Sequence, residues 1–327
     1  MEKKIFILTM EGGGTRGILQ AKFLQLFEEK IGFSVYSLFD FFTGVSIGGV
    51  HALILALLQG SGRDLCHLYT RKNLKKIFSK SSWFTFPMVF SPKYNDKGKT
   101  SFFYSIFGER ILSSAKKNVL VSSYDFINNK PYFFSTFSKN PLTLHSRVCD
   151  IADATSAAPV YFPPKGIASH NTFFIDGGFM SNNGTSDALI EALKAGYSEK
   201  NIKILSLGTG GVEKAYKKMG KHSQKWGAAQ WFTKGNLLDK SFTATRLTAV
   251  HNCYRLLPEN FLHIPFDSYS FSYALDEQDP GNLEKLMKYA EEEFNKNYIK
   301  LQEFFFEKKK SLFYKIKFLK MAIRFHG

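Results

Sequence analysis

Apolar and polar positions follow two different periods along residues 1–60. Residues 4–10 (KIFILTM) form a continuous apolar run of strand length, and residues 17–30 repeat apolar side chains at helical spacing. A second apolar run at 38–43 ends at Gly44, and residues 47–59 have the composition of a buried helix. This order of strand, glycine loop, helix, strand, tight turn and helix predicts a parallel sheet with helices on its faces.

Shorter elements continue this pattern toward the C-terminus. The pattern predicts further strands at 118–122, 132–137, 172–175, 202–207 and 260–266, and helices at 148–158, 186–195, 227–250 and 282–303. The polar, lysine-rich residues 213–225 are expected to be a loop. Residues 61–118 have a less regular pattern, which favours an insertion over the sheet.

The length of 327 residues suits one large α/β domain, or one domain with a small appendage. We expect a core at residues 1–210, including the insertion at about 61–118, and a continuation of the same domain at 211–305. Residues 306–327 are rich in lysine, contain interleaved apolar residues, and carry only one acidic residue, Glu307. This composition favours an amphipathic tail that contacts a membrane surface, although a solvated terminal helix would have the same composition.

Charge adds to this picture. Lys and Arg number 44 against 28 Asp and Glu, which gives a net charge of +16. Such an excess favours anionic partners, including membrane surfaces, although a general compositional bias toward Lys and Phe would also produce it. No RNA-binding or DNA-binding motif is present, so no nucleic-acid partner is expected.

Cysteine usage and the N-terminal residues favour a reducing, cytoplasmic compartment. The three cysteines are far apart, and neither a metal-ligand spacing nor a disulfide framework is recognisable. The apolar run IFILTM is shorter than a signal-peptide core, and no window of about 18 apolar residues is long enough to span a membrane. We therefore expect a cytoplasmic protein, peripheral at membranes, without a metal or cofactor.

Candidate chemistry begins at residues 44–49 (GVSIGG). The spacing G-x-S-x-G places Ser46 between Gly44 and Gly48, after an apolar run and before a buried helix. A nucleophilic serine on a sharp strand-to-helix turn requires small neighbours, which these glycines provide. The alternative is an ordinary serine at a helix N-terminus.

The glycine loop at residues 11–17 (EGGGTRG) is the second candidate. Uncovered backbone N–H groups before a helix form an anion site. The spacing of Gly12, Gly14 and Gly17 also matches a dinucleotide fingerprint, but the second strand ends in GVSIGG where that fold needs an acid. An oxyanion hole that faces Ser46 accounts for both loops. Its candidate residues are Gly12, Gly13, Gly14, Thr15, Arg16 and Gly17, with Arg16 either stabilising charge or making a structural salt bridge.

A third motif, IDGG, follows the strand predicted at 172–175. Asp176 ends this strand and is followed by Gly177 and Gly178, so its carboxylate can face a site at the edge of the sheet. A turn aspartate is the alternative interpretation.

Together these stretches resemble the patatin-like phospholipases. Five blocks carry the resemblance, in the order and spacing of that family over about residues 4–210 and more weakly to about residue 300. They are EGGGTRG, GVSIGG, ATSAAPVYFPP (154–164), IDGGFMSNNGT (175–185) and ILSLGTG (204–210). The resemblance implies a three-layer α/β fold with a central, mostly parallel sheet flanked by helices.

The resemblance also implies a function. Its expected activity is hydrolysis of acyl esters of phospholipids, lysophospholipids or galactolipids, through an acyl-enzyme and without a metal. In that scheme Ser46 is the nucleophile and Asp176 its base. The amides of Gly13 and Gly14 form the oxyanion hole, with Arg16 beside it. Two positions depart from the family pattern: Glu11 stands where Asp is usual, and Gly184 where many members have Pro.

Two alternatives remain open at this stage. A Ser-His-Asp esterase would need a histidine after Asp176, and His222, His251 and His263 qualify by position without a recognisable motif. An effector lipase in signalling or defence would depend on an unidentified protein, nucleotide or membrane activator. The aromatic residues 83–90 (WFTFPMVF) are expected either to line an acyl channel or to pack in the core.

Overall fold

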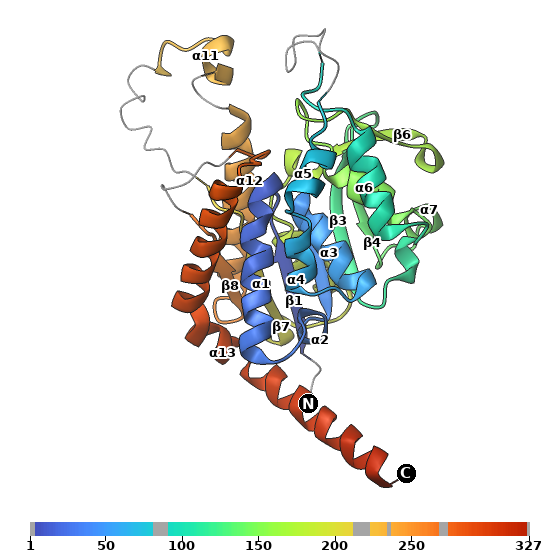
Figure 1. Cartoon of the computed structure of the whole chain (residues 1–327), viewed down its shortest axis with the longest axis vertical. Helices are drawn as coiled ribbons and strands as arrows, with labels where there is room; N and C mark the ends of the chain where they lie inside the picture. Colours follow the sequence, from blue (N-terminus) through green and yellow to red (C-terminus); the bar gives the residue numbers. More distant parts are fainter. Residues whose placement is uncertain (1–3, 81–90, 212–222, 234–236, 268–273, 326–327) are drawn as a thin grey trace.

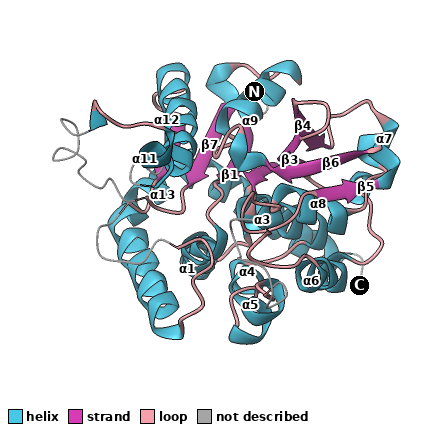
Figure 2. Cartoon of the chain, turned by 90° about the horizontal axis from the view of Figure 1, so that it is seen from above, coloured by secondary structure: helices cyan, strands magenta, loops and turns pink. Residues whose placement is uncertain are grey.

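The structure is a computed structural model that describes residues 4–80, 91–211, 223–233, 237–267 and 274–325. Within these ranges the chain forms three layers, with one sheet between two groups of helices (Figures 1 and 2). The predicted α/β fold with a central, mostly parallel sheet flanked by helices is confirmed. The aromatic segment at 83–90 and most of the lysine-rich loop at 213–225 lie outside the described residues.

The described strands form one sheet in the order β5-β6-β3-β2-β1-β7-β8, with β4 also paired to β3. Neighbours from β3 through β2, β1 and β7 to β8 are parallel, whereas β4 and β6 run antiparallel to β3 and β5 antiparallel to β6. The strands are β1 (Ile5–Met10), β2 (Phe41–Val45), β3 (Asn118–Asp125), β4 (Lys130–Ser135), β5 (Lys165–Ile167), β6 (Thr172–Asp176), β7 (Ile202–Leu207) and β8 (Phe261–Ile264).

Helices cover the two faces unequally, as Figure 2 shows. The larger core joins one sheet face to α1 (Ile18–Ile31), α3 (Ile47–Leu58), α4 (Gly62–His67), α5 (Arg71–Ile77), α6 (Lys97–Phe107), α8 (Val148–Thr155) and α13 (Pro280–Phe325). The smaller core joins the opposite face to α9 (Thr185–Lys194) and α12 (Leu237–Leu256). Short helices α2 (Val35–Leu38), α7 (Pro141–Leu144) and α11 (Ala228–Thr233) complete the described α-helices.

The sequence of β1 explains why it lies at the centre. All six of its residues are buried. Alternate side chains enter different cores: Phe6, Leu8 and Met10 belong to the larger cluster, whereas Ile5 and Ile7 belong to the smaller one. A continuous apolar run is what a parallel strand covered on both faces requires.

Three expectations about the elements need correction. Residues 61–118, expected to be less regular, contain α4, α5 and α6, and their buried side chains such as Leu65 and Phe103 belong to the larger core. The helix expected at 227–250 is present as α11 and α12, and the helix expected at 282–303 continues to Phe325 as α13. The last part of α13 extends away from the body of the protein (Figure 1). Within the described ranges, no helix has an apolar stretch long enough to cross a bilayer.

The buried part of α13 generates a stability prediction. Phe305 is 1% exposed, and its ring centroid lies 5.2–5.5 Å from those of Phe6, Phe27 and Phe39. Replacing Phe305 with Ala removes these contacts and leaves a cavity, so we expect a loss of about 3–5 kcal/mol in the free energy of unfolding, measured by urea denaturation. The neighbouring Phe306 is 65% exposed, and Phe306→Ala is the matched control, expected to change stability by less than about 0.5 kcal/mol. Equal losses in the two variants would show that α13 does not dock as described.

Candidate active site

Strands β2 and β6 meet end to end along one edge of β3. Because β4 occupies the other edge of β3, both β2 and β6 must lie on the same side. β2 ends with Val45 opposite Ser122, and β6, running in the opposite direction, ends with Asp176 opposite Ser123. Ser46 is the next residue after Val45. The two candidate catalytic residues, which are distant in sequence, are therefore brought together at this junction.

Ser46 occupies a sharp turn between β2 and α3. Its φ of 54° and ψ of −127° lie in a region that L-residues other than glycine rarely adopt. The flanking glycines allow this turn to pack closely. A Cβ at Gly44 would lie 2.2 Å from the carbonyl oxygen of Gly48, and one at Gly48 would lie 2.2 Å from that of Met10. The small residues that the sequence places around Ser46 are therefore required by the backbone itself.

Asp176 is buried beside this serine, with 5% of its surface exposed. Its Oδ1 accepts the N–H of Gly178 at 2.8 Å, and the side chain of Ser46 lies close enough to lower the pKa of this carboxyl group. Burial raises the pKa of Asp176 from about 3.8 to about 6, while the side chain of Ser46, the hydrogen bond from Gly178 and the charge of Lys99 act in the opposite direction. Gly177 packs against the backbone of Ser122, where a Cβ would lie 2.4 Å from the carbonyl oxygen.

The glycine loop lies against the serine turn. A Cβ at Gly12 would lie 3.0 Å from the Cβ of Ser46. Gly14 has a φ of +57°, and among the described residues the N–H groups of Gly12, Gly13 and Gly14 donate to no acceptor. The N–H of Thr15, by contrast, donates to the carbonyl of Leu275 at 2.9 Å. Within the predicted oxyanion set, Gly12, Gly13 and Gly14 are therefore the residues whose amides are available to an anion.

Arg16 links two loops. Its Nε donates to the carbonyl of Gly13 at 3.2 Å, and its Nη1 donates to the carbonyl of Gly210, after β7, at 3.2 Å. Gly17 ends the short 3₁₀ turn Gly14–Gly17, where a Cβ would lie 2.3 Å from the hydroxyl of Tyr69. These contacts favour a structural role for both residues in shaping the loop.

Two asparagines after Asp176 hold the glycine loop in place. Asn182 Nδ2 donates to the carbonyl of Gly12 at 3.3 Å, and Asn183 Nδ2 donates to Glu11 Oε1 at 2.8 Å. Burial raises the pKa of Glu11 to about 7, although Arg246, whose Nη1 lies 3.6 Å from Oε2, acts in the opposite direction. The sequence blocks contain these residues, but only the fold shows that Glu11 and the asparagine pair join the loop to the strand end that carries Asp176.

The histidines do not assemble a triad in the described part of the chain, where no ring hydrogen-bonds to Ser46 or Asp176. His263 lies on β8, three strands from β2, or about 14 Å away at the usual strand spacing. Burial lowers its pKa to about 3, and its Nδ1 contacts Ser206 Oγ at 3.0 Å. His251 is exposed on α12, and His222 lies outside the described residues. This arrangement favours a dyad over the rival triad.

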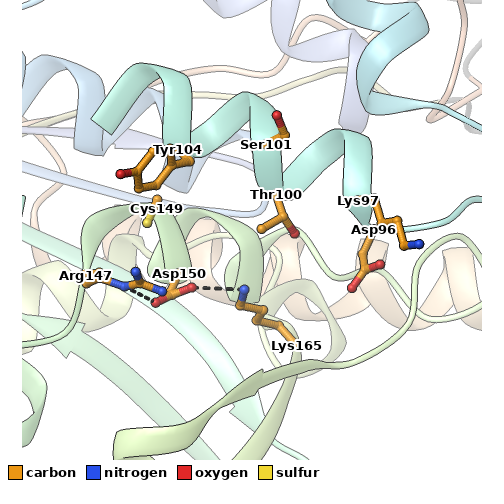
Figure 3. A pocket seen from close by; sticks show the side chains of 9 residues that line it. All are labelled: Asp96, Lys97, Thr100, Ser101, Tyr104, Arg147, Cys149, Asp150 and Lys165. Carbon is orange, nitrogen blue, oxygen red and sulfur yellow. Dashed lines mark hydrogen bonds and ion pairs between the residues drawn. The ribbon is translucent and has the colours of Figure 1, made fainter. Parts of the chain in front are cut away.

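A separate pocket of about 510 Å³ lies between α6 and α8 (Figure 3). Its lining includes neither Ser46 nor Asp176. Within it Asp150 forms ion pairs with Arg147 at 2.8 Å and Lys165 at 2.9 Å. These ion pairs compensate most of the charge on its wall, so we assign the pocket no substrate role.

Comparison with known proteins identifies the family. The family model described as patatin-like phospholipase matches residues 8–189, which is more than half of the chain. The chain belongs to the patatin-like phospholipase family. Lipid hydrolysis is the activity that this membership indicates, and the predicted resemblance is confirmed.

Individual relatives agree with this assignment. A cGAMP-activated phospholipase from Vibrio cholerae serotype O1 is 33% identical over 237 residues, which cover 65% of this chain and 66% of that protein. Patatin-like protein 2 from Oryza sativa subsp. indica is 27% identical over 349 residues, covering 90% and 85% of the two chains. The solved structure of VipD from Legionella pneumophila matches with a TM-score of 0.51 and 12% identity, over 90% of this chain and 66% of that one. This last similarity supports the patatin-like fold alone.

The packing of the serine turn generates a second prediction. In Gly48→Ala the new methyl group would overlap the backbone of Met10, which cannot move without displacing β1. We expect the free energy of unfolding to fall by about 3 kcal/mol, measured by urea denaturation. At Gly227 the nearest atom to an added Cβ is the side-chain Oε1 of Gln230 at 3.5 Å, so Gly227→Ala is the control and should be near neutral. A Gly48→Ala protein as stable as the control would contradict the close approach of α3 to β1.

Proposed function

We propose that this patatin-like protein is a phospholipase A-type acyl hydrolase that cleaves fatty-acyl esters of membrane phospholipids through Ser46 and Asp176. One observation carries the proposal: Ser46, on its strained turn, and the buried carboxylate of Asp176 lie together where two strands meet. A serine hydroxyl becomes a useful nucleophile when it is held on a strained turn beside a base. Lysophospholipids belong to the same substrate class.

In the first half-reaction, Ser46 Oγ attacks the ester carbonyl carbon while the Asp176 carboxylate takes the hydroxyl proton. The carbonyl oxygen becomes an oxyanion, which the N–H groups of Gly13 and Gly14 stabilise. The intermediate then collapses, the ester C–O bond breaks, and protonated Asp176 returns the proton to the departing alcohol. The acyl group is left as an ester on Ser46.

In the second half-reaction, a water molecule attacks this acyl-enzyme. Asp176 takes one proton from the water, and the N–H groups of Gly13 and Gly14 again stabilise the oxyanion. Collapse breaks the Ser46 ester, returns the proton to Ser46 Oγ and releases the fatty acid. A carboxylate pKa of about 6 suits these proton transfers better than one near 4, because it lies closer to that of a base poised at neutral pH.

Peripheral contact with an anionic membrane is part of this proposal. The net charge of +16 supports attraction to anionic lipid. Phe173 and Phe179, which precede and follow Asp176 in sequence, are 51% and 44% exposed, and Phe126 on the adjoining turn is 56% exposed. Exposed aromatic side chains on the strand that ends at Asp176 and on its neighbouring turns suit a protein that must reach a lipid ester at a bilayer surface. We also retain the proposed division into a core at 1–210, its continuation at 211–305 and a basic tail at 306–327.

Fatty-acid release from phospholipid vesicles tests the dyad. With EDTA present, we expect the wild-type protein to release fatty acid, and Ser46→Ala and Asp176→Asn to lose at least about 10³-fold in rate, because the nucleophile or its base is absent. Mass spectrometry of the products checks the reaction, and circular dichroism checks that each variant folds.

The same assay tests membrane contact when it compares anionic with zwitterionic vesicles at low and high salt. We expect a faster rate on anionic vesicles that decreases with added salt. Equal rates on both lipids would contradict an electrostatic membrane contact. Undiminished release by Ser46→Ala would contradict the dyad itself.

The raised pKa of Asp176 predicts an acid limb. The base must be ionised to accept a proton, so activity should be present above about pH 6 and fall about tenfold per pH unit below it. The measurement is kcat/KM against pH with a soluble uncharged ester, which removes the pH dependence of vesicle binding. An acid limb near pH 4 would show that burial does not raise the pKa of this carboxyl group.

A second candidate is the activator-dependent effector lipase, favoured by one observation. The Vibrio cholerae relative is a cGAMP-activated phospholipase, and it is 33% identical to this chain over 237 residues. We infer that a nucleotide of this class is the activator to test first. If regulation is shared, added cGAMP should raise fatty-acid release by about fivefold or more, while Ser46→Ala stays inactive with cGAMP. The same rate with and without cGAMP would favour a constitutive lipase or a different activator.

A further inference from the structure

One segment outside the predicted site residues contacts both members of the dyad. The N–H of Ser46 donates to Thr155 Oγ1 at 2.9 Å, and the Thr155 hydroxyl donates in turn to the carbonyl of Ser122 at 2.7 Å. Two residues further along, the carbonyl of Ala157 accepts the N–H of Asp176 at 3.0 Å. The last turn of α8 and the residue pair after it thus hold the nucleophile and its base from one side.

We propose that Thr155 is a positioning residue for the dyad, and that the end of α8 fixes the separation and orientation of Ser46 and Asp176. The inference rests on the proposed function of these two residues. Thr155 does not contact the reacting atoms in this account. It acts through the backbone of Ser46, whose N–H belongs to the first turn of α3 and has no acceptor within that helix.

The geometry of Thr155 suits this role. A hydroxyl group has one proton to donate and can accept others, and here donation to the Ser122 carbonyl directs an oxygen lone pair toward Ser46. Thr155 is fully buried and packs over Gly49 of α3, where an added Cβ would meet its Oγ1 at 3.1 Å and its Cγ2 at 3.2 Å. The β-branched side chain is restricted at χ1, so its hydroxyl is held in position. The bond therefore stabilises an unfavourable φ at Ser46 that the turn requires.

A buried ion pair anchors the same end of α8. Lys99 of α6 is 2% exposed, and its Nζ lies 2.9 Å from Asp153 Oδ1 and 3.0 Å from the carbonyl of Asp153. The other carboxylate oxygen of Asp153 meets Lys165 Nζ at 3.1 Å. Figure 3 shows α6 and α8 side by side, with Asp150 paired to Lys165. Helix α8 is thus fixed to α6 and β5 at the turn that contacts the dyad.

The anchor also places charge near the base. The charged groups on the elements around β6 are Lys97 and Lys99 on α6, Asp150 and Asp153 on α8, Lys165 on β5 and Asp125 on β3, and the same elements carry Tyr104, Cys149 and Tyr124. Each of the carboxylates on α8 is paired with a lysine. Lys99 is the charged side chain that lowers the pKa of Asp176, against the larger effect of burial. Removing the Lys99 charge should therefore favour the protonated base.

The test uses Thr155→Val and Thr155→Ser, with Thr143→Val as the matched control. Thr143 on α7 is also buried. Its hydroxyl forms a hydrogen bond with the hydroxyl of Tyr132 on β4, away from the dyad. Kinetics with a soluble ester should show kcat reduced about 10–100-fold in Thr155→Val with KM within about twofold, because a misplaced nucleophile slows chemistry rather than binding. Thr155→Ser restores the hydroxyl and should recover kcat to within about threefold, and Thr143→Val should match the wild type. Thermal unfolding identifies any variant that does not fold.

Ser46→Ala separates the two claims. If it keeps the wild-type activity, the proposed function fails. If Ser46→Ala is inactive while folded Thr155→Val has the wild-type kcat, or Thr155→Ser is as slow as Thr155→Val, the positioning role is contradicted.

Lys99→Met tests the anchor independently, since Asp153 keeps Lys165 as its partner. We expect kcat on the pH plateau to fall at least about threefold, because the end of α8 that holds the dyad loses one of its two lysine partners. The acid limb should also move to higher pH, because the charge of Lys99 lowers the pKa of Asp176. A wild-type plateau kcat in folded Lys99→Met would contradict the role of the anchor. If Thr155→Val does not fold, this plateau kcat decides the proposal.

Discussion

The candidate site depends on one constraint, which is that β2 and β6 share a single edge of β3. β4 fills the opposite edge, so an antiparallel β6 can pair with β3 only beyond the point where β2 stops. The two strand ends therefore face each other, with Ser46 leaving one and Asp176 ending the other. No flexible side chain has to reach across the sheet, because backbone hydrogen bonds set the positions of both residues. The close contacts of Gly44, Gly48 and Gly177 are consequences of this crowded junction.

Buried polar groups stabilise the loops around that junction. Tyr69 and Gln20 bond to opposite sides of the His51 ring at 2.8 and 3.0 Å, and Gln20 Nε2 donates to the carbonyls of Glu11 and Leu207. Burial lowers the pKa of His51 to about 3, so the ring is uncharged and serves as a fixed link rather than a base. Buried networks of this kind specify one arrangement when their members are satisfied. Here they fix the glycine loop against the ends of β1 and β7.

The sequence predicted the parts of the site in which short-range rules dominate. Apolar runs located β1, β2 and β7, and the glycines around Ser46 and before Asp176 marked places where backbone segments approach closely. It did not predict α4, because this helix has six residues and begins at a capping box between Ser61 and Asp64, which is too short for a helical period to appear.

The contacts made by Thr155 were not predictable either. Its bond to Ser46 joins positions 109 residues apart. In the sequence Lys99 has the features of a surface lysine, but the packing of α6 buries it against α8. Such residues look ordinary in sequence, because their importance arises only from the packing of elements. The antiparallel pairing of β6 with β3 was not predictable either, because the pattern of a short strand does not show in which direction the strand runs relative to its neighbour.

Covalent labelling of the nucleophile tests the central claim most directly. A fluorophosphonate reacts with an activated serine, and intact mass followed by peptide mapping locates the adduct. The account predicts one adduct per chain, on Ser46, formed much more slowly in folded Asp176→Asn and absent in Ser46→Ala. An adduct on another serine, or labelling of Ser46 at the same rate without the Asp176 carboxylate, would show that the meeting of β2 and β6 does not build the catalytic dyad.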